Sequence, residues 1–211
     1  MTDARAEILA RIEGIPRAAA AVPVPRGYRR AGAGSPAERV DLFCERVSDY
    51  RAEVRRTPAA TAGEVVDAEC VSRSASRVGV PTGLPATWRP RGAEIVVDTG
   101  LTAHELDALD GVVTGCTVAV AETGTIILTA GPAEGRRALT LVPDLHVCIV
   151  EAAQVVELVP EAVERVANVV RTKRSPVTLI SGPSATSDIE LSRVEGVHGP
   201  RTLVVILVDP D

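Results

Sequence analysis

The sequence predicts an α/β fold in which a mostly parallel sheet is covered by helices. From residue 93 onward, short apolar runs alternate with helical stretches and with turn residues such as Gly, Pro and Asp. These runs are apolar at almost every position, which is typical of strands that are covered on both faces. The length of 211 residues and the 45% share of hydrophobic residues suit one domain with a large core.

The N-terminal residues form a separate region in this prediction. Residues 4–13 place Ile8, Leu9 and Ile12 on one face of a short amphipathic helix. Residues 14–34 contain several prolines and glycines, which exclude a regular helix and indicate a linker or arm. We therefore expect residues 1–34 to be an N-terminal helix and a Pro/Gly-rich arm, and residues 35–211 to be the folded domain.

Four further helices are expected in the folded domain. Ser35, Pro36 and Glu38 form a capping box with proline at the first helical position, and the apolar periodicity continues to about residue 56. Thr102 and Glu105 give the same N-terminal signal for another helix. The expected helices cover residues 36–56, 62–78, 102–109 and 160–171.

Seven apolar runs are expected to be strands. They cover residues 94–98, 112–114, 117–121, 125–129, 145–150, 177–180 and 203–208. The third and fourth runs are separated only by the turn Glu122-Thr123-Gly124, which is too short for a parallel crossover. These two strands should pair antiparallel, so the sheet is expected to be mixed although mostly parallel.

Composition and cysteine spacing exclude several classes of function. No apolar run approaches the roughly 20 residues that a membrane-spanning helix requires, and no apolar segment follows the first residues. We therefore expect a soluble, cytoplasmic protein without a transmembrane segment. The net charge of −5 and the four aromatic residues argue against a nucleic-acid partner. The four cysteines include no C-x-x-C pair and the histidines have no ligand spacing, so no iron–sulfur or other metal site is expected.

The turn between the two antiparallel strands is the first candidate site. Ligands of open α/β sheets usually bind at strand ends, and Glu122 could act there as a base or a nucleophile. Thr123, Gly124 and Thr125 would contribute hydroxyl groups and a close approach of the backbone to the ligand. The alternative is an ordinary turn with a solvated glutamate.

A loop rich in small and hydroxyl-bearing residues follows the predicted strand 177–180 and is the second candidate site. Backbone N–H groups and hydroxyls in such a loop can converge on an anion such as phosphate or carboxylate. The loop lacks the lysine of a P-loop and the spacing of a dinucleotide fingerprint. The candidate binding residues are Ser181, Gly182, Ser184, Thr186 and Asp188.

The turn that precedes the last predicted strand is the third candidate site. His198 could exchange a proton with a ligand, and Gly199 and Arg201 could help to bind an anion. A Ser–His–Asp triad of Ser184, His198 and Asp188 can also be drawn, but no G-x-S-x-G motif supports it. The sequence leaves open whether the three loops meet.

Four segments together resemble the LUD-domain family, in particular its lactate-utilization members, over residues 35–208. They are Ala121-Glu-Thr-Gly-Thr-Ile-Ile-Leu128, Val142-Pro-Asp-Leu-His-Val-Cys-Ile-Val150, Ser181-Gly-Pro-Ser-Ala-Thr-Ser-Asp-Ile-Glu190 and Gly196-Val-His-Gly-Pro-Arg201. The resemblance implies a three-layer α/β/α sandwich similar to the sugar-phosphate isomerase and CoA-transferase-like superfamily, with additional N-terminal helices. It also implies a three-component system that oxidises L-lactate to pyruvate, in which iron–sulfur clusters lie in partner subunits and this chain holds no cofactor.

Three hypotheses about function follow. In the first, the chain is a substrate-binding or catalytic subunit of a lactate dehydrogenase complex that does not use NAD. The loop 181–188 and Arg201 would then hold the lactate carboxylate, and His198 or Glu122 would take a proton. In the second, the chain is a non-catalytic assembly or ligand-sensing subunit whose arm contacts the iron–sulfur partners. In the third, it is an independent enzyme on a sugar phosphate or an acyl-CoA, which only the resemblance in fold suggests.

Overall fold

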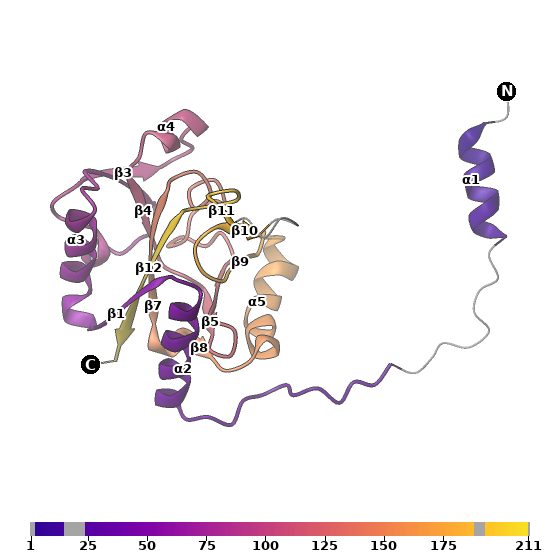
Figure 1. The fold of residues 1–211 in the computed structure, drawn as a ribbon, viewed down its shortest axis with the longest axis horizontal. Helices are drawn as coiled ribbons and strands as arrows, with labels where there is room; N and C mark the ends of the chain where they lie inside the picture. Colours follow the sequence, from indigo (N-terminus) through magenta and orange to yellow (C-terminus); the bar gives the residue numbers. More distant parts are fainter. Residues whose placement is uncertain (1–2, 15–23, 188–192, 211) are drawn as a thin grey trace.

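The computed structural model describes residues 3–14, 24–187 and 193–210 and contains a parallel sheet of six strands (Figure 1). All neighbouring strands in this main sheet are parallel, which confirms the α/β class. In spatial order the strands are β1 (Glu53–Pro58), β12 (Thr202–Asp209), β7 (Leu145–Glu151), β4 (Gly111–Thr114), β2 (Arg77–Pro81) and β3 (Glu94–Asp98).

The antiparallel strands form a second sheet of four strands instead of joining the edge of the main sheet. Strands β5 and β6 form the antiparallel hairpin that the short turn predicts. In spatial order this second sheet contains β8 (Val155–Val156), β5 (Val118–Val120), β6 (Thr125–Leu128) and β9 (Thr178–Ile180). A small antiparallel pair is formed by β10 (Ala185–Ser187) and β11 (Arg193–Glu195).

The helices begin where the capping residues predict. Both capping boxes, Ser35 with Glu38 and Thr102 with Glu105, are present. The α-helices are α1 (Ala4–Glu13), α2 (Pro36–Asp49), α3 (Ala62–Ser72), α4 (Ala103–Asp107) and α5 (Val159–Lys173). Short 3-10 turns occur at η1 (Ala59–Thr61), η2 (Ala86–Trp88) and η3 (Ala152–Gln154).

Two helices end earlier than their periodicity predicts. The chain leaves α2 through Arg51, whose φ of 65° is incompatible with a continuing helix, and then forms β1. It leaves α3 through Ser74, whose φ is 55°, and then forms β2. Val54 suits the helical period, but its place beside Val205 in the sheet decides its structure. Pairing with a buried strand therefore overrides local propensity at both positions.

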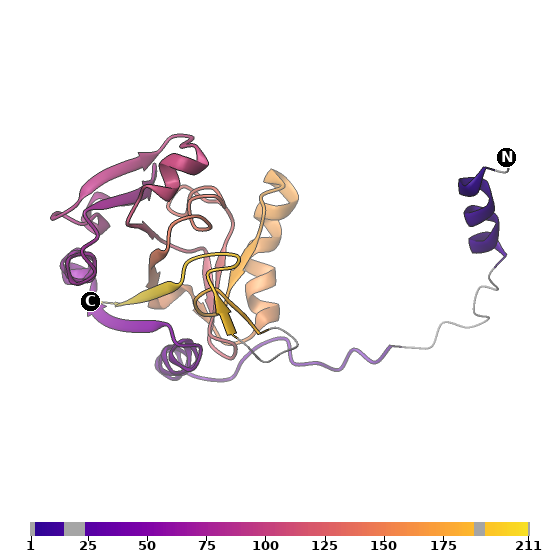
Figure 2. The same ribbon diagram turned by 45° about the horizontal axis from the view of Figure 1, so that its top comes forward.

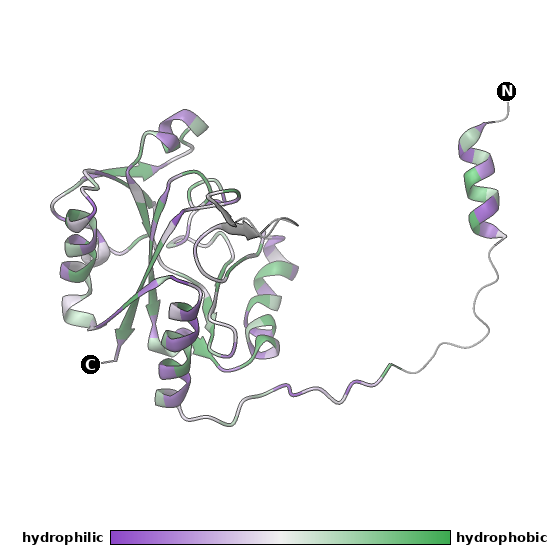
Figure 3. Cartoon of the chain, viewed as in Figure 1, coloured by the Kyte–Doolittle hydropathy of each residue, from purple (hydrophilic) through white to green (hydrophobic). Residues whose placement is uncertain are grey.

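The core lies on both faces of the main sheet. One cluster packs α2 and the second sheet against β7 and β12, and another packs α3 against the opposite face. Helix α5 covers the outer face of the second sheet. Figures 1 and 2 show α3 on one side of the main sheet, with α2 and α5 on the other. In Figure 3 most strands of the two larger sheets are coloured as hydrophobic, while the helices alternate hydrophobic and hydrophilic colours along their length, as expected of amphipathic helices.

The N-terminal helix lies outside these layers. None of the residues of α1 is buried, and its apolar side chains Ile8, Leu9 and Ile12 are exposed. In the part of the chain that the structure describes, no helix has both the length and the apolarity needed to cross a membrane.

Replacing Gly63 by alanine is expected to destabilise the protein by about 1–2 kcal/mol. In a helix alanine is about 1 kcal/mol more favourable than glycine. Overpacking costs about 1–3 kcal/mol, and a clash with a main-chain atom, which cannot turn aside as a side chain can, places this cost at about 2–3 kcal/mol. Here the new Cβ would lie 2.2 Å from the carbonyl oxygen of Thr87. Urea unfolding measures the change, and Gly27→Ala, with no atom within 4 Å of the new Cβ, is the control. Equal stability of both variants with the wild type would contradict the packing argument.

Candidate functional site

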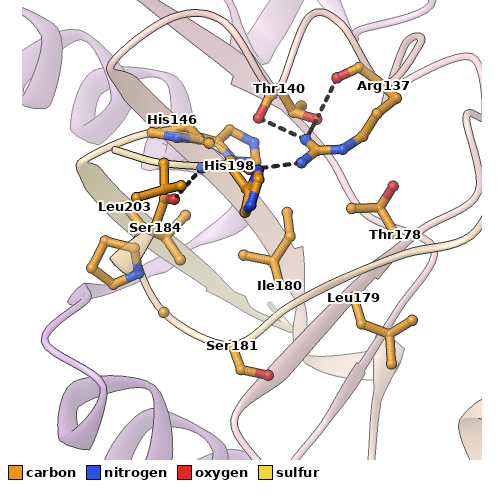
Figure 4. A pocket seen from close by; sticks show the side chains of 15 residues that line it. Arg137, Thr140, His146, Thr178, Leu179, Ile180, Ser181, Ser184, His198 and Leu203 are labelled. Carbon is orange, nitrogen blue, oxygen red and sulfur yellow. Dashed lines mark hydrogen bonds between the residues drawn. The ribbon is translucent and has the colours of Figure 1, made fainter. Parts of the chain in front are cut away.

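A cavity of about 290 Å³ lies at the amino ends of β7 and β12 (Figure 4). His146 and Leu203, near the starts of these two strands, lie at one side of it. The end of β9 and the following loop form one wall, the turn 197–200 forms another, and Arg137 and Thr140 form a third. The cavity therefore combines a cation, two imidazoles and several hydroxyl groups.

The Arg137 guanidinium is held in place by neutral acceptors. It donates to the carbonyl oxygen of Thr140 at 3.0 Å, to the hydroxyl of Thr140 at 3.3 Å and to the carbonyl oxygen of His198 at 2.9 Å. Among the described residues, no carboxylate forms an ion pair with it. Burial lowers the pKa of Arg137, but a guanidinium stays protonated at neutral pH. Its positive charge is therefore available to an anion in the cavity.

A buried imidazole nitrogen adjoins the same cavity. His146 is fully buried, and its Nε2 lies 2.8 Å from the hydroxyl of Thr114. Its Nδ1 is buried and has no hydrogen-bond partner among the residues that the structure describes. A buried polar atom without a partner is costly, so a ligand that bonds to this nitrogen would remove the cost.

Two of the three predicted loops come together at the cavity. Ser181, Gly182, Ser184, His198 and Gly199 all line it. The backbone N–H of His198 donates to the Ser184 hydroxyl at 3.0 Å, and the N–H of Ser184 donates to the carbonyl of Pro200 at 2.8 Å. The dashed lines in Figure 4 show Arg137 and Ser184 both bonded to the main chain of His198.

Gly182 is needed for this arrangement of the loop. Its φ is 84°, in the region that favours glycine, and a Cβ there would lie 2.9 Å from the carbonyl oxygen of Tyr50. The loop thus passes close to the backbone that follows α2. This contact places Ser181 and Ser184 on the cavity wall.

The remaining predicted loop, the turn 122–125, does not line the cavity and contacts its wall only through the hydroxyl of Thr125, which meets Ser181. The Thr125 hydroxyl lies 2.8 Å from that of Ser181 and 2.7 Å from that of Thr123. Glu122 is instead ion-paired with Arg29 of the N-terminal arm. Gly124 packs against the backbone of α2, where a Cβ would approach Arg46 to 2.8 Å. No residue of this turn, charged or uncharged, therefore lines the cavity.

The remaining predicted residues lie elsewhere. Arg201 is 60% exposed in its side chain and pairs with Asp144 at 3.0 Å, outside the cavity. Thr186 lies in β10, and Asp188 lies outside the described residues. The sequence does not single out Arg137, and it gives His146 only as a residue of the predicted strand 145–150. The one sequence signal for His146 is its position two residues after Pro143-Asp144, which places it near the amino end of the predicted strand.

A second cavity, of about 940 Å³, lies at the opposite ends of the strands of the main sheet from the first. It adjoins the carboxyl ends of β2 and β3, the position where ligands of open α/β sheets usually bind. Its lining includes Cys116, Glu134, Lys173 and the glycine-containing loop 130–135. Glu134 accepts backbone hydrogen bonds from Thr129 at 2.6 Å and from Gly131 at 2.9 Å.

Asp98 at this second cavity should make stability depend on pH. Burial of its carboxyl opposes ionisation, but Arg136 and the N–H groups of Gly100 and Leu101 together lower its pKa. A carboxyl whose folded pKa is lowered stabilises the protein above its unfolded pKa of about 3.9. That stability is lost as the pH falls through the folded pKa.

Asp98→Asn should therefore lower the free energy of unfolding at pH 7, and the difference from the wild type should shrink as the pH falls below about 4. Chemical denaturation at a series of pH values measures this difference. Asp144→Asn, which breaks an exposed ion pair, is the control and should change stability little at any pH. A difference at Asp98 that stays constant with pH would contradict the expectation.

Comparison with known proteins assigns the family. A family model described as the LUD domain matches residues 93–208. The chain therefore belongs to the LUD-domain family.

Its relatives include proteins that carry a more specific name. A Deinococcus radiodurans protein named "Lactate utilization protein C" is 47% identical over 194 residues, which are 92% of this chain and 87% of that protein. A Bacillus pumilus protein of the same name is 36% identical over 95 residues, which are 44% of this chain and 39% of that protein. The crystal structure of a DUF162 family protein from Deinococcus radiodurans has a TM-score of 0.71 and 40% identity, covering 83% of this chain and 99% of that one.

Proposed function

We propose that this chain is the cluster-free subunit of an iron–sulfur-dependent system that oxidises L-lactate to pyruvate. In this proposal the first cavity binds the carboxylate of a 2-hydroxy acid. The observation that carries it is the Arg137 guanidinium, which lines a small cavity and whose hydrogen-bond acceptors among the described residues are all carbonyl and hydroxyl oxygens. The names of the relatives support lactate utilization as the process.

The groups around the cavity suit a 2-hydroxy acid. Arg137 would bind the carboxylate, since a guanidinium pairs well with the two oxygens of this group. The hydroxyls of Ser181 and Ser184 would orient the ligand. Arg137 thus takes the role that the sequence suggested for Arg201, whose side chain is already paired with Asp144.

The oxidation also needs a proton acceptor. Conversion of L-lactate to pyruvate releases two electrons and two protons, one of them from the hydroxyl group. His146 would take the hydroxyl proton at Nδ1, and His198, at the cavity wall, remains the second candidate. The two electrons would pass to the iron–sulfur partner subunits, which would hold the acceptor.

The test is reconstitution of the whole system. The tagged chain is purified anaerobically from lactate-grown source cells, and lactate-dependent dye reduction is measured with and without it. We expect iron–sulfur proteins to co-purify and the activity to disappear when this chain is omitted. Full activity without the chain would overturn the proposal. Thermal shift with L-lactate, sugar phosphates and acyl-CoA then distinguishes the third hypothesis from the other two, because a ligand that binds the native state raises the midpoint of thermal unfolding.

An assembly role is a second candidate, and the N-terminal arm favours it. The backbone N–H of Gly34 donates to Glu157 at 2.7 Å, and Arg29 pairs with Glu122, so residues near 29–34 lie against the domain. Helix α1 leaves its apolar residues uncovered. Deleting residues 1–23 keeps the arm contacts and removes α1, so it should abolish co-purification if α1 binds a partner. Unchanged co-purification would exclude this role for α1.

A further inference from the structure

The second cavity lies where the connections of the main sheet reverse direction. After β2 the chain continues to β3 on one side, whereas the next strand of this sheet after β4 is β7, on the other side. The carboxyl ends of the neighbouring strands β2 and β4 therefore leave a crevice between them, which is the usual position of a ligand in an open α/β sheet. Pro81 and Thr82 at the end of β2, and Cys116 and Thr117 after β4, line this cavity. Its volume is about three times that of the first cavity, so it admits a molecule larger than lactate.

One wall of this cavity is the loop 130–135, which a buried carboxylate holds in place. Glu134 is 4% exposed and accepts hydrogen bonds from the N–H groups of Thr129 and Gly131. The N–H of Gly83 donates to the carbonyl oxygen of Pro132 at 3.0 Å, and a Cβ at Gly83 would lie 2.6 Å from the Pro132 ring. The wall is thus formed before any ligand binds, and this lowers the entropy that binding costs.

Arg136 lines the cavity with part of its guanidinium unused. Its Nε and Nη2 donate to the carboxylate of Asp98 at 2.9 and 3.0 Å. The Asp98 side chain is 3% exposed and also accepts from the N–H groups of Gly100 and Leu101, so its oxygens are occupied. Nη1 of Arg136 has no hydrogen-bond partner among the described residues, and the side chain is 43% exposed. Arg136 can therefore offer a ligand single N–H groups, but not its fork.

Lys173 is a second cation at the same cavity. It lies in the last turn of α5, is exposed, and forms no ion pair with any residue that the structure describes. The two carboxylates of the cavity, those of Asp98 and Glu134, are buried and already bonded to N–H groups, so the surface that a ligand meets is cationic. Hydroxyl groups that bond to no other described residue also line the cavity, at Thr82, Thr99 and Ser175.

We propose that this cavity binds a phosphorylated small molecule that is larger than lactate. The phosphate would accept hydrogen bonds from Lys173, from Nη1 of Arg136 and from the nearby hydroxyls. A carboxylate binds best to the fork of a guanidinium, which Asp98 already occupies at Arg136. A phosphate has more oxygens and suits an ammonium group and single donors on different side chains. The rest of the ligand would lie against the apolar part of the lining, which consists of Pro81, Pro132, Ala133 and Val169.

The test measures binding of two phosphate probes to the full-length chain by isothermal titration calorimetry. The probes are inorganic phosphate and AMP, and adenosine is the uncharged counterpart of AMP. We expect both phosphates to bind at millimolar concentrations or below. AMP should bind at least as tightly as inorganic phosphate, because the larger molecule also covers the apolar lining. Binding of adenosine as tight as that of AMP, or no binding of either phosphate, would overturn the proposal.

Two variants at the end of α5 locate the site. Lys173→Gln should weaken binding of AMP about tenfold, because it removes a hydrogen bond between charged groups. Arg171→Gln makes the same change of charge in the same turn of the helix but outside the cavity, so it should change the affinity less than about twofold. Equal effects of the two substitutions would mean that the phosphate is attracted only by the general charge of this helix end, and would refute the site.

Titration with L-lactate separates this site from the first cavity. The two cavities lie at opposite ends of the strands, and none of the described residues lines both. Lys173→Gln should therefore bind L-lactate as the wild type does, and Arg137→Ala should bind AMP as the wild type does. Loss of AMP binding in Arg137→Ala would place the phosphate in the first cavity and contradict the proposal. If L-lactate does not bind to the wild type, the proposed function fails, while the titration with AMP still decides whether the second cavity is a phosphate site.

Discussion

Replacing Arg137 by alanine is expected to weaken binding of L-lactate to the protein about 100-fold. Truncating one partner of a buried charge pair typically costs about 2–5 kcal/mol, and a factor of 100 corresponds to about 2.7 kcal/mol. The ligand carboxylate would keep the Ser181 and Ser184 hydroxyls but would lose its countercharge. Isothermal titration calorimetry with L-lactate measures the affinity of both proteins.

The matched control for this variant is Arg201→Ala. Arg201 directly follows Pro200, which lines the same cavity, but the Arg201 side chain is exposed and paired with Asp144. Its loss should change affinity less than about twofold, as expected for an exposed ion pair. Arg137→Lys should recover only part of the affinity, because an ammonium lacks the planar fork of the guanidinium. Equal effects at Arg137 and Arg201 would mean that the ligand binds elsewhere.

Much of the fold could be predicted because its signals are local. Strands β4, β6, β7 and β12 are apolar at almost every position, and this follows directly from their burial on both faces. The hairpin followed from the length of one turn, and two helix starts followed from capping boxes. These features depend on residues that are neighbours in the sequence.

The missed features depend on contacts between distant residues. Strand β1 carries Arg55 and Arg56 at the edge of the sheet, so its sequence shows no apolar run, and only pairing with β12 makes it a strand. The antiparallel strands contain no local sign that they would leave the main sheet. Pairing partners, unlike caps and turns, are not encoded within a short window.

The candidate site shows the same division. The loops with Ser181 and His198 carry recognisable small and polar residues, so they could be predicted as binding loops. The role of Arg137 depends on the carbonyl of His198, which is 61 residues away in the sequence. Glu122 and Arg201 were equally plausible by residue type. What separates them from Arg137 is that each has an ion-pair partner elsewhere in the structure.

Replacing Glu134 by alanine is expected to destabilise the protein by about 3 kcal/mol. Glu134 is 4% exposed and its carboxylate accepts from the backbone N–H groups of Thr129 and Gly131 and from the hydroxyl of Thr117. Each buried donor left without a partner costs about 1–3 kcal/mol. Two backbone donors lose their acceptor, and water from the adjoining cavity offsets part of this cost.

Thermal unfolding should show this change as a fall in Tm of about 6–12 °C, at about 2–4 °C per kcal/mol for a chain of this size. Glu122→Ala is the matched control, since that glutamate forms an exposed ion pair with Arg29 and should contribute less than about 1 kcal/mol. Glu134→Gln keeps one acceptor oxygen and should lie between the alanine variant and the wild type. If Glu134→Ala were as stable as Glu122→Ala, the loop 130–135 would be held by its backbone turns alone, and Glu134 would be free to serve a ligand in the second cavity.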